Sequence, residues 1–179
     1  MPKYLAFLRA INVGGHTVKM DHLRRLFEAL GFANVETFIA SGNVIFESSS
    51  KSAKALEKKI EKHLHESLGY EVATFIRTTA ELAAVAQYQP FSTTELNDKG
   101  NRLYIAFTAD PPSAAAKKKL LASANETDEF HIHGREVYWL CRKQFHESKF
   151  SGALLEKILG MPATVRNVTT VRKMAAKYA

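Results

Sequence analysis

Apolar and polar residues along the chain follow two alternating periods, one typical of strands and the other of helices. Residues 3–11 form an apolar, strand-like run, and a helix that opens at Asp21 and stops at Gly31 follows it. Apolar side chains recur in this helix every three or four positions, which is the spacing of one helix face: Leu23, Leu26, Phe27 and Leu30. The chain therefore predicts a strand and then an amphipathic helix that packs on it.

The same alternation continues through the rest of the first half. The elements predicted in order are a strand over 35–40, a strand over 44–46, a helix over 51–68 and a strand over 71–77. Ser41-Gly42-Asn43 joins the first two of these strands with residues typical of a hairpin turn, and Gly69 ends the helix. The resulting order, βαββαβ, predicts a ferredoxin-like unit.

The second half repeats this order after a short helix and a polar connection. Thr78 and Glu81 have the spacing of a capping box, and residues 87–100 are polar and irregular, which predicts a linker. The elements expected next are a strand over 102–108, a helix over 113–124, a hairpin of 129–133 and 136–141, a helix over 151–159, a strand over 164–167 and a final helix over 169–178. No identity of residues between the halves is apparent, so the predicted repeat is one of element order.

These patterns predict an α+β fold of tandem ferredoxin-like subdomains with antiparallel sheets and an extra C-terminal helix. The expected boundaries are a subdomain over residues 1–78, a helix and linker over 79–100, and a second subdomain with the C-terminal helix over 101–179. Each half is small for independent stability. We therefore expect the two subdomains to share an interface or a continuous sheet.

Composition narrows the class of protein. The 179 residues have no apolar run long enough to span a bilayer, and Met1-Pro2-Lys3-Tyr4 lacks the pattern of a signal peptide, so a cytoplasmic protein without membrane association is expected. The single cysteine, Cys141, excludes an internal disulfide. A net charge of +7 favours an anionic partner. The alternative is that most lysines form the solvated faces of amphipathic helices.

The first candidate site is the segment from Arg9 to Gly15, at the end of the first strand. Successive backbone N–H groups at Gly14 and Gly15 can form an anion-binding nest, to which Arg9 and Asn12 would add donors. Lys19 would contribute a further positive charge. The segment matches neither the phosphate-binding loop of nucleotide hydrolases nor the dinucleotide-binding motif. A sharp turn without a ligand is the alternative reading of the glycines.

Three further segments carry candidate ligand-binding residues. Ser41 and Asn43 lie in the predicted hairpin turn, and Lys149 precedes the helix over 151–159. Arg166 and Asn167 repeat the pairing of arginine with asparagine seen at Arg9 and Asn12, just before the last helix, where free N–H groups suit an anion. The alternative roles are structural: Ser41 and Asn43 shape the turn, and Asn167 or Thr169 caps the helix.

Other chemistries have weaker support in the sequence. His131 and His133 share one face of a strand without an obvious third ligand, so no metal is expected, and no motif implies a cofactor. Ser41 lacks the context of a nucleophile, and Cys141 is expected in the core. The RNA-binding signature that some proteins of this topology carry is absent, although Tyr104, His131, His133 and Tyr138 are candidates for a weak stacking face.

Several of these segments together resemble a widespread bacterial family of domains of unknown function, whose members open with R-G/A-I-N-V-G-G and continue with T-x-I-x-S-G-N-V-x-F. The first block of the resemblance comprises residues 9–15, Met20, Gly31-Phe32, residues 37–43 and Phe46. It continues over essentially the whole chain, through Arg77, Pro90, Ser148-Lys149, Glu156-Lys157 and the T-x-R-N-x-x-T of residues 164–170.

The resemblance implies paired ferredoxin-like subdomains and no established activity, substrate or cofactor. The chain departs from the family pattern at three positions: Ala10 where glycine is usual, Gln89 where asparagine is common, and Val168 where an aromatic residue is usual. The first two departures change no charged group, so the candidate site at Arg9 is unaffected by them. The third weakens any stacking role at that position.

The sequence therefore leads to one functional hypothesis and two alternatives. We expect a small anionic ligand, bearing phosphate or carboxylate, to bind in a cleft between the subdomains through Arg9, Asn12, the Gly14-Gly15 amides and Arg166. The first alternative is a basic nucleic-acid-binding module. The second is that the motifs serve only to shape turns and the interface between subdomains. No acid–base pair assigns a reaction, so enzymatic activity is left open.

Overall fold

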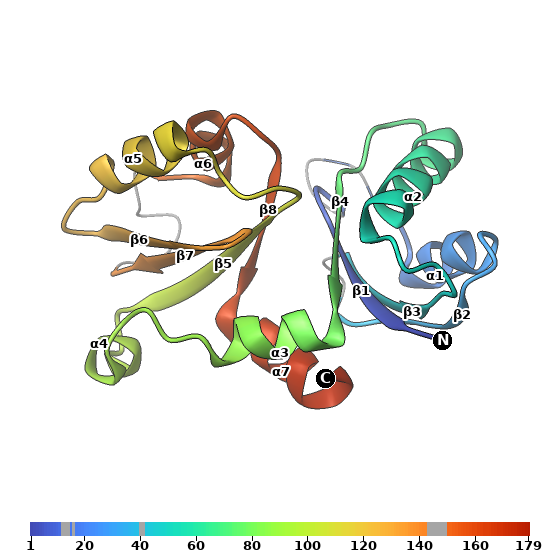
Figure 1. The fold of residues 1–179 in the computed structure, drawn as a ribbon, viewed down its shortest axis with the longest axis horizontal. Helices are drawn as coiled ribbons and strands as arrows, with labels where there is room; N and C mark the ends of the chain where they lie inside the picture. Colours follow the sequence, from blue (N-terminus) through green and yellow to red (C-terminus); the bar gives the residue numbers. More distant parts are fainter. Residues whose placement is uncertain (12–14, 16, 40–41, 143–149) are drawn as a thin grey trace. The chain divides into compact units, whose positions relative to one another are not determined.

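A computed structural model describes residues 1–11, 15, 17–39, 42–142 and 150–179 of the chain. The chain divides into two compact units (Figure 1). Unit 1 comprises Met1–Ala83 with Tyr178–Ala179, and unit 2 comprises Ala84–Lys177. The boundary between them falls inside a helix, α3 (Thr79–Gln87).

Unit 1 contains a four-stranded antiparallel sheet with two helices on one face. Its elements are β1 (Lys3–Leu8), α1 (Met20–Glu28), β2 (Ala33–Thr37), β3 (Asn43–Glu47), α2 (Ala53–Leu68) and β4 (Thr74–Thr78). The strand order β2-β3-β1-β4 is that of a ferredoxin-like unit. Both helices pack on the face of the sheet that carries Ala6 and Val44, where α1 contributes Phe27 and α2 contributes Ile60 to one buried core. The predicted βαββαβ fold is confirmed.

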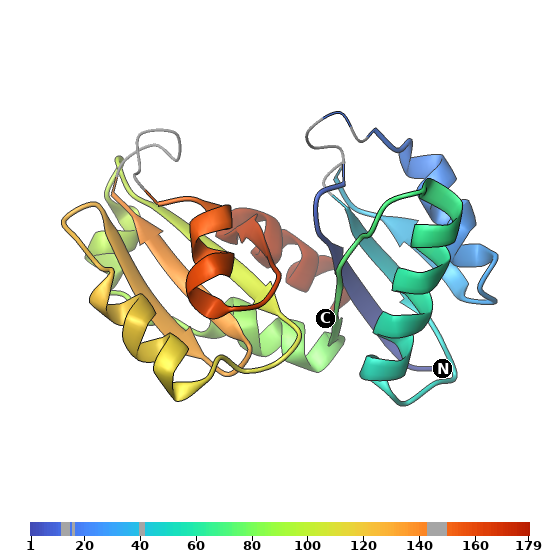
Figure 2. The same ribbon diagram turned by 90° about the horizontal axis from the view of Figure 1, so that it is seen from above.

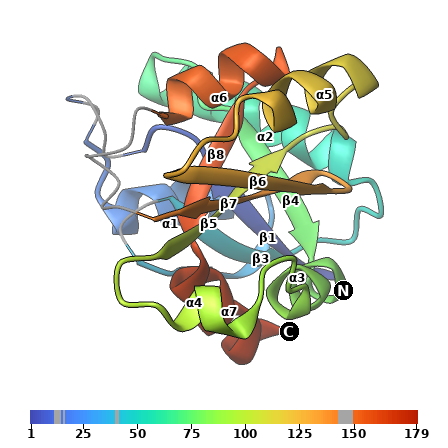
Figure 3. The same ribbon diagram turned by 90° about the vertical axis from the view of Figure 1, so that its left-hand side faces the viewer.

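Unit 2 repeats this topology. Its elements are α4 (Thr93–Asn97), β5 (Arg102–Thr108), α5 (Ala114–Ala122), β6 (Asp128–His133), β7 (Glu136–Cys141), α6 (Gly152–Leu159), β8 (Ala163–Asn167) and α7 (Val168–Tyr178). The strand order is β6-β7-β5-β8, again antiparallel throughout. Helices α5 and α6 lie side by side on one face of this sheet (Figure 2), and α4 and α7 lie on the other side of it (Figure 3).

The strand registers show that the repeat extends to individual residues, which corrects the expectation that only the element order is shared. Leu8 pairs with Thr74 in unit 1, and Thr108 pairs with Ala163 in unit 2, so the two central strands are in equivalent register. That register aligns Tyr4-Leu5-Ala6-Phe7 with Tyr104-Ile105-Ala106-Phe107. Three of the four aligned residues are identical, in the strand at the centre of each sheet.

Several element boundaries differ from the sequence prediction. The first strand ends at Leu8 instead of continuing to residue 11, because Ala10 has a φ of 61°, in the left-handed region where no strand continues. The predicted linker contains the helix α4, which the hydroxyl of Ser92 caps by accepting from the Glu95 N–H at 3.2 Å. The capping box before α3 is confirmed, since Glu81 N–H donates to Thr78 Oγ1 and Thr78 N–H donates to Glu81 Oε1.

The edge strand β4 donates its outward backbone N–H groups to carboxylates. Thr74 N–H donates to Glu61 Oε2 at 3.0 Å, and Ile76 N–H donates to Glu57 Oε2 at 2.8 Å. Thr78 completes the row through its bond to Glu81. An edge strand with unpaired N–H groups invites pairing with another chain, so these glutamates satisfy and shield the edge. Two of them come from α2, which fixes that helix along the strand.

Candidate functional site

The two sequence motifs of unit 1 meet where β1 ends. Leu8 N–H donates to Gly42 O at 2.8 Å, so the residues after β1 lie beside the turn that precedes β3. The contact is close: a Cβ at Gly42 would lie 3.1 Å from the Cβ atoms of both Leu8 and Ile11. We call Arg9, Ala10, Ile11, Gly42 and Asn43 the strand-end cluster. Fold topology, not sequence proximity, brings these residues together.

The backbone at this end of the sheet is strained. Ala10 has a φ of 61° and Ile39, which is exposed and β-branched, has a φ of 58°. Left-handed conformations cost a non-glycine residue about 1–2 kcal/mol, and they are rarest for β-branched side chains. Two such residues therefore lie in the two connections that meet at the strand-end cluster, and strain of this kind concentrates at functional sites.

Arg9 is positioned by the sheet edge on the other side. Its backbone N–H donates to Ala73 O at 2.9 Å, just before β4 begins, and its side chain is half-buried. The guanidinium is a planar fork of donors that suits phosphate or carboxylate. Gly15, the last residue of the motif, is exposed with a φ of 88°.

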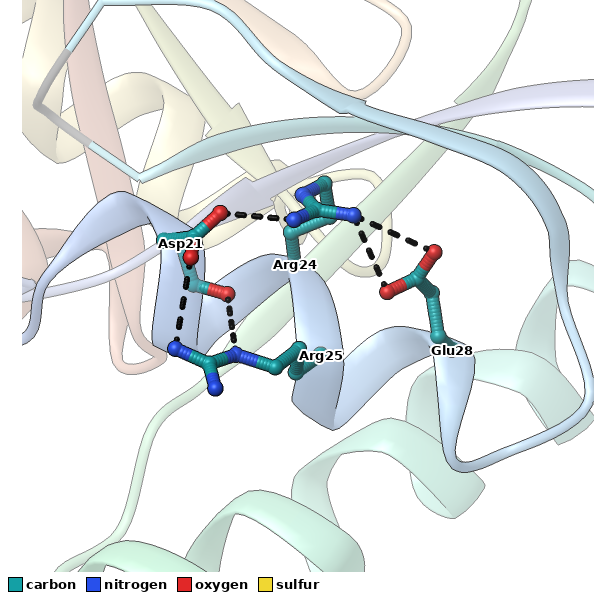
Figure 4. Close-up of polar contacts among 4 residues, drawn as sticks. All are labelled: Asp21, Arg24, Arg25 and Glu28. Atoms are coloured by element: carbon teal, nitrogen blue, oxygen red, sulfur yellow. Dashed lines mark hydrogen bonds and ion pairs between the residues drawn. The ribbon is translucent and has the colours of Figure 1, made fainter.

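Helix α1 starts after this connection, and the residue at its N-cap is unusual. Lys19 occupies the N-cap position, is exposed, and makes no side-chain capping hydrogen bond in the described structure, whereas serine caps α2, α4, α5 and α6. A cation at a helix N-terminus is unfavourable unless an anion is near. Asp21 in the first turn is paired with Arg24 at 2.6 Å and with Arg25 at 3.3 Å (Figure 4). The Arg24 hydrogen bond is the main cause that lowers the pKa of this carboxyl.

Asn43 has a structural role in the turn. It is fully buried, and its Nδ2 donates to Phe38 O at 2.9 Å while Phe38 N–H donates to Asn43 O at 3.0 Å. These bonds close the connection between β2 and β3. The other candidate residues of the sequence hypothesis, Asn12, Gly14, Ser41 and Lys149, lie outside the described residues.

The remaining two candidates, Arg166 and Asn167, lie in unit 2. Arg166 is 7% exposed, and its Nη1 donates to Thr164 Oγ1 at 2.7 Å and to Val165 O at 3.1 Å. Burial lowers the pKa of this guanidinium to about 10, because the charged form loses hydration. Asn167 caps α7 by accepting from Thr169 N–H at 2.8 Å, which is the structural role that the sequence left open for it.

Sequence reasoning missed the counterpart of Arg166 in unit 1. Arg77 pairs with Leu5 as Arg166 pairs with Ile105, so the two arginines occupy equivalent positions one residue before the end of the last strand. Arg77 is 1% exposed, and its Nη1 donates to the carbonyl of the preceding residue, Ile76, as Arg166 does to Val165. The signal in the sequence is an arginine just before a strand-to-helix junction in each half.

The equivalent of the strand-end cluster in unit 2 is built differently. Thr108 N–H donates to Arg135 O at 3.1 Å, which repeats the bond between Leu8 and Gly42. In addition, Thr108 Oγ1 lies 2.8 Å from Asp110 O and 2.9 Å from Arg135 O and can donate its one proton to either, so a hydroxyl occupies this corner. Ala109 stands where unit 1 has Arg9. An arginine directly after the central strand is therefore a feature of unit 1, whereas unit 2 has Arg135 in the turn that contacts Thr108.

The two strand histidines of unit 2 contact a tyrosine. His131 Nε2 lies 2.7 Å from Tyr88 Oη, and the His133 ring stacks on Tyr88 with centroids 4.0 Å apart. Among the described residues, no group of three or more His, Cys, Asp or Glu is arranged to hold a metal ion. Cys141 is buried in the core, as expected. Within the described ranges, no helix has both the length and the apolar character needed to cross a bilayer.

Two ferredoxin-like units in one chain, each with a helix after its last strand, define the class of α+β protein to which this chain belongs. Its sequence matches the model of a family described as "Protein of unknown function (DUF1697)" over residues 1–138, so the chain belongs to that family. Among curated proteins, none matches it. The fold is similar to that of the conserved bacterial protein SP0830 from Streptococcus pneumoniae, with a TM-score of 0.74 and 24% identity over 98% of this chain and 97% of the other.

Proposed function

We propose that unit 1 binds a small anionic ligand, bearing phosphate or carboxylate, at the strand-end cluster. The observation that carries the proposal is the hydrogen bond between Leu8 and Gly42, which brings the two motif segments of the sequence together beside Arg9. A core packed only for stability has no need of an arginine and a left-handed alanine directly after β1, and the residue of unit 2 at the position of Arg9 is Ala109.

The electrostatics of the corner support an anion. Arg9 offers a fork of donors, and Lys19 adds a second cation at the N-terminus of α1, where the helix dipole is also positive. Asp21 is the one carboxylate in the first turn of that helix, and its charge is directed to Arg24 and Arg25. Asn12, Gly14 and Ser41 belong to the same two sequence segments and lie outside the described residues.

Thermal unfolding with and without ligand tests the proposal. We expect inorganic phosphate or one of a panel of phosphorylated metabolites and carboxylates to stabilise the wild type by about 2.7 kcal/mol at a hundredfold excess over Kd. For a chain of this size that is a rise in Tm of roughly 5–10 °C. Arg9→Ala should lose this response, and Arg9→Lys should retain part of it.

Arg172→Ala is the matched control, because Arg172 is exposed on α7 in unit 2 and its removal changes the net charge by the same amount. This variant should respond to the ligand as the wild type does. Equal responses of Arg9→Ala and the wild type would refute the proposal. If Arg9→Ala lowers Tm and no anion in the panel stabilises the wild type, the motif has the purely structural role.

A further inference from the structure

Helix α2 carries a row of lysines on the face turned away from the sheet. Lys54, Lys58 and Lys62 are exposed and spaced by four residues, which places them on one ridge of the helix, and exposed Lys51 lies just before it. The opposite face packs Leu56, Ile60 and Leu64 into the core of unit 1. We call Lys51, Lys54, Lys58 and Lys62 the lysine ridge.

The glutamates of α2 do not balance this charge, because two of the three turn inward. Glu57 is 4% exposed and accepts from Ile76 N–H, and Glu61 accepts from Thr74 N–H, so both serve the edge of β4. The remaining glutamate, Glu66, is exposed. The ion pair from Lys54 Nζ to Glu57 Oε1 is long at 3.9 Å.

The ridge differs from the lysine beside it. Lys59 donates to Leu30 O at 3.3 Å and lies 5.4 Å from the centre of the Phe32 ring, so it contributes to the packing of unit 1. The ridge lysines instead place like charges four residues apart, an arrangement that destabilises a helix. A polyanion that contacts the ridge would convert this repulsion into binding energy.

We propose that the lysine ridge binds the phosphodiester backbone of nucleic acid. Lysines four residues apart are separated by about 6 Å along the helix axis, so that each reaches a different phosphate of an extended chain. Lysine contacts to phosphate carry no sequence information, which makes the expected binding independent of sequence and strongly dependent on salt. This site is separate from the strand-end cluster and does not depend on it.

The test is fluorescence anisotropy of a labelled single-stranded oligonucleotide, titrated with the full chain at several salt concentrations. The triple variant Lys51→Gln, Lys58→Gln, Lys62→Gln removes three ridge charges and keeps good helix formers. Each phosphate contact to a single strand contributes about 0.7 to the slope of log K against log salt. We therefore expect the loss of three contacts to make that slope less steep by about two. The Arg9→Ala variant should bind the oligonucleotide as the wild type does.

The matched control removes three lysines from an exposed helix of unit 2: Lys117→Gln, Lys118→Gln, Lys119→Gln. It has the same net charge as the ridge variant, so it should keep nearly the full slope. Circular dichroism and Tm check that both variants are folded. Equal loss of slope in the two variants, or no binding by the wild type at low salt, would overturn the proposal. Binding to anionic lipid vesicles without binding to the oligonucleotide would overturn it as well.

Discussion

Ala10 occupies a left-handed conformation that only glycine adopts at no steric cost. Its φ is 61°, in the region that glycine reaches without a clash of a Cβ atom. We expect Ala10→Gly to raise the free energy of unfolding by about 0.5–1 kcal/mol, since relief of strain outweighs the added entropy of the unfolded chain. Urea unfolding measures this change.

Ala115→Gly is the control for that substitution. Ala115 is an exposed residue inside α5, where glycine costs about 1 kcal/mol relative to alanine. The two alanine-to-glycine changes should therefore shift the urea midpoint in opposite directions. A fall in both midpoints would mean that Ala10 is not strained in the folded protein.

Gly42 combines a left-handed backbone with a close contact. Its φ is 82°, and an added Cβ would lie 3.1 Å from the Cβ atoms of Leu8 and Ile11, which cannot move without the backbone. Gly69 has nearly the same φ, 84°, with nothing within 4 Å of an added Cβ. We expect Gly69→Ala to cost about 1 kcal/mol of stability and Gly42→Ala to cost about 1–3 kcal/mol more. Equal losses would show that the strand-end cluster repacks freely.

Tyr138 is a buried tyrosine whose ionisation makes the stability of the protein depend on pH in the alkaline range. Its Oη donates to Val85 O at 3.1 Å, and burial is the main cause that raises its pKa well above the usual value near 10. Above about pH 10 the tyrosine ionises in the unfolded chain but stays protonated in the folded one, so stability falls as pH rises.

The variant Tyr138→Phe should lose about 1 kcal/mol at neutral pH, because the hydrogen bond is removed. It should then lose less stability than the wild type between about pH 9 and pH 11, because the group that titrates is gone. Urea midpoints at both pH values measure the two slopes. Parallel declines in wild type and variant would contradict the assignment.

At the scale of elements, the edge of β4 depends on carboxylates from α2. Glu57 is buried and accepts from Ile76 N–H at 2.8 Å. Glu57→Ala leaves that N–H without its acceptor, and we expect a loss of about 1.5–3 kcal/mol, the range for a hydrogen bond to a charged group. Glu66→Ala, on the exposed face of the same helix, should change stability by less than about 0.5 kcal/mol. Similar losses from the two variants would rule out the role of Glu57 at the edge.

Element order and type could be predicted from the sequence, because hydrophobic period and caps are local signals. The capping box at Thr78 and the order of strands and helices in both units are examples. Boundaries were less predictable where tertiary contacts decide them. The run of apolar residues extends to Ile11, yet β1 ends at Leu8 because the chain turns there to pack Ile11 against Gly42. Helix α4 was missed because only Ser92 marks it within a polar segment.

At the scale of the whole molecule, the chain contains the same topology twice, and the two units differ in the residue that follows the central strand. The equivalent arginines, Arg77 and Arg166, and the shared Tyr-x-Ala-Phe of the central strands are the common features. The sequence motif marked Arg9 as a candidate, but its neighbours across the turn depend on strand pairing, which no local pattern encodes. The repeat of element order is predictable from the sequence, but the residue identities between the halves are not, because they are confined to β1 and β5 and only the strand registers show which residues correspond.

The repeated topology also leads to a prediction about cooperativity. The boundary between the units falls inside α3, a continuous helix with Leu82 and Val85 both buried, so neither unit can lose its part of this helix without fraying the other's. The only tryptophan, Trp139, is buried in unit 2, with Nε1 donating to Asp128 Oδ1 at 2.8 Å. We expect Gly42→Ala, a change in unit 1, to lower the urea midpoint reported by Trp139 fluorescence as much as the midpoint reported by circular dichroism. If instead the fluorescence transition stays at the wild-type midpoint while the other moves, the units unfold independently, and α3 connects them without coupling them.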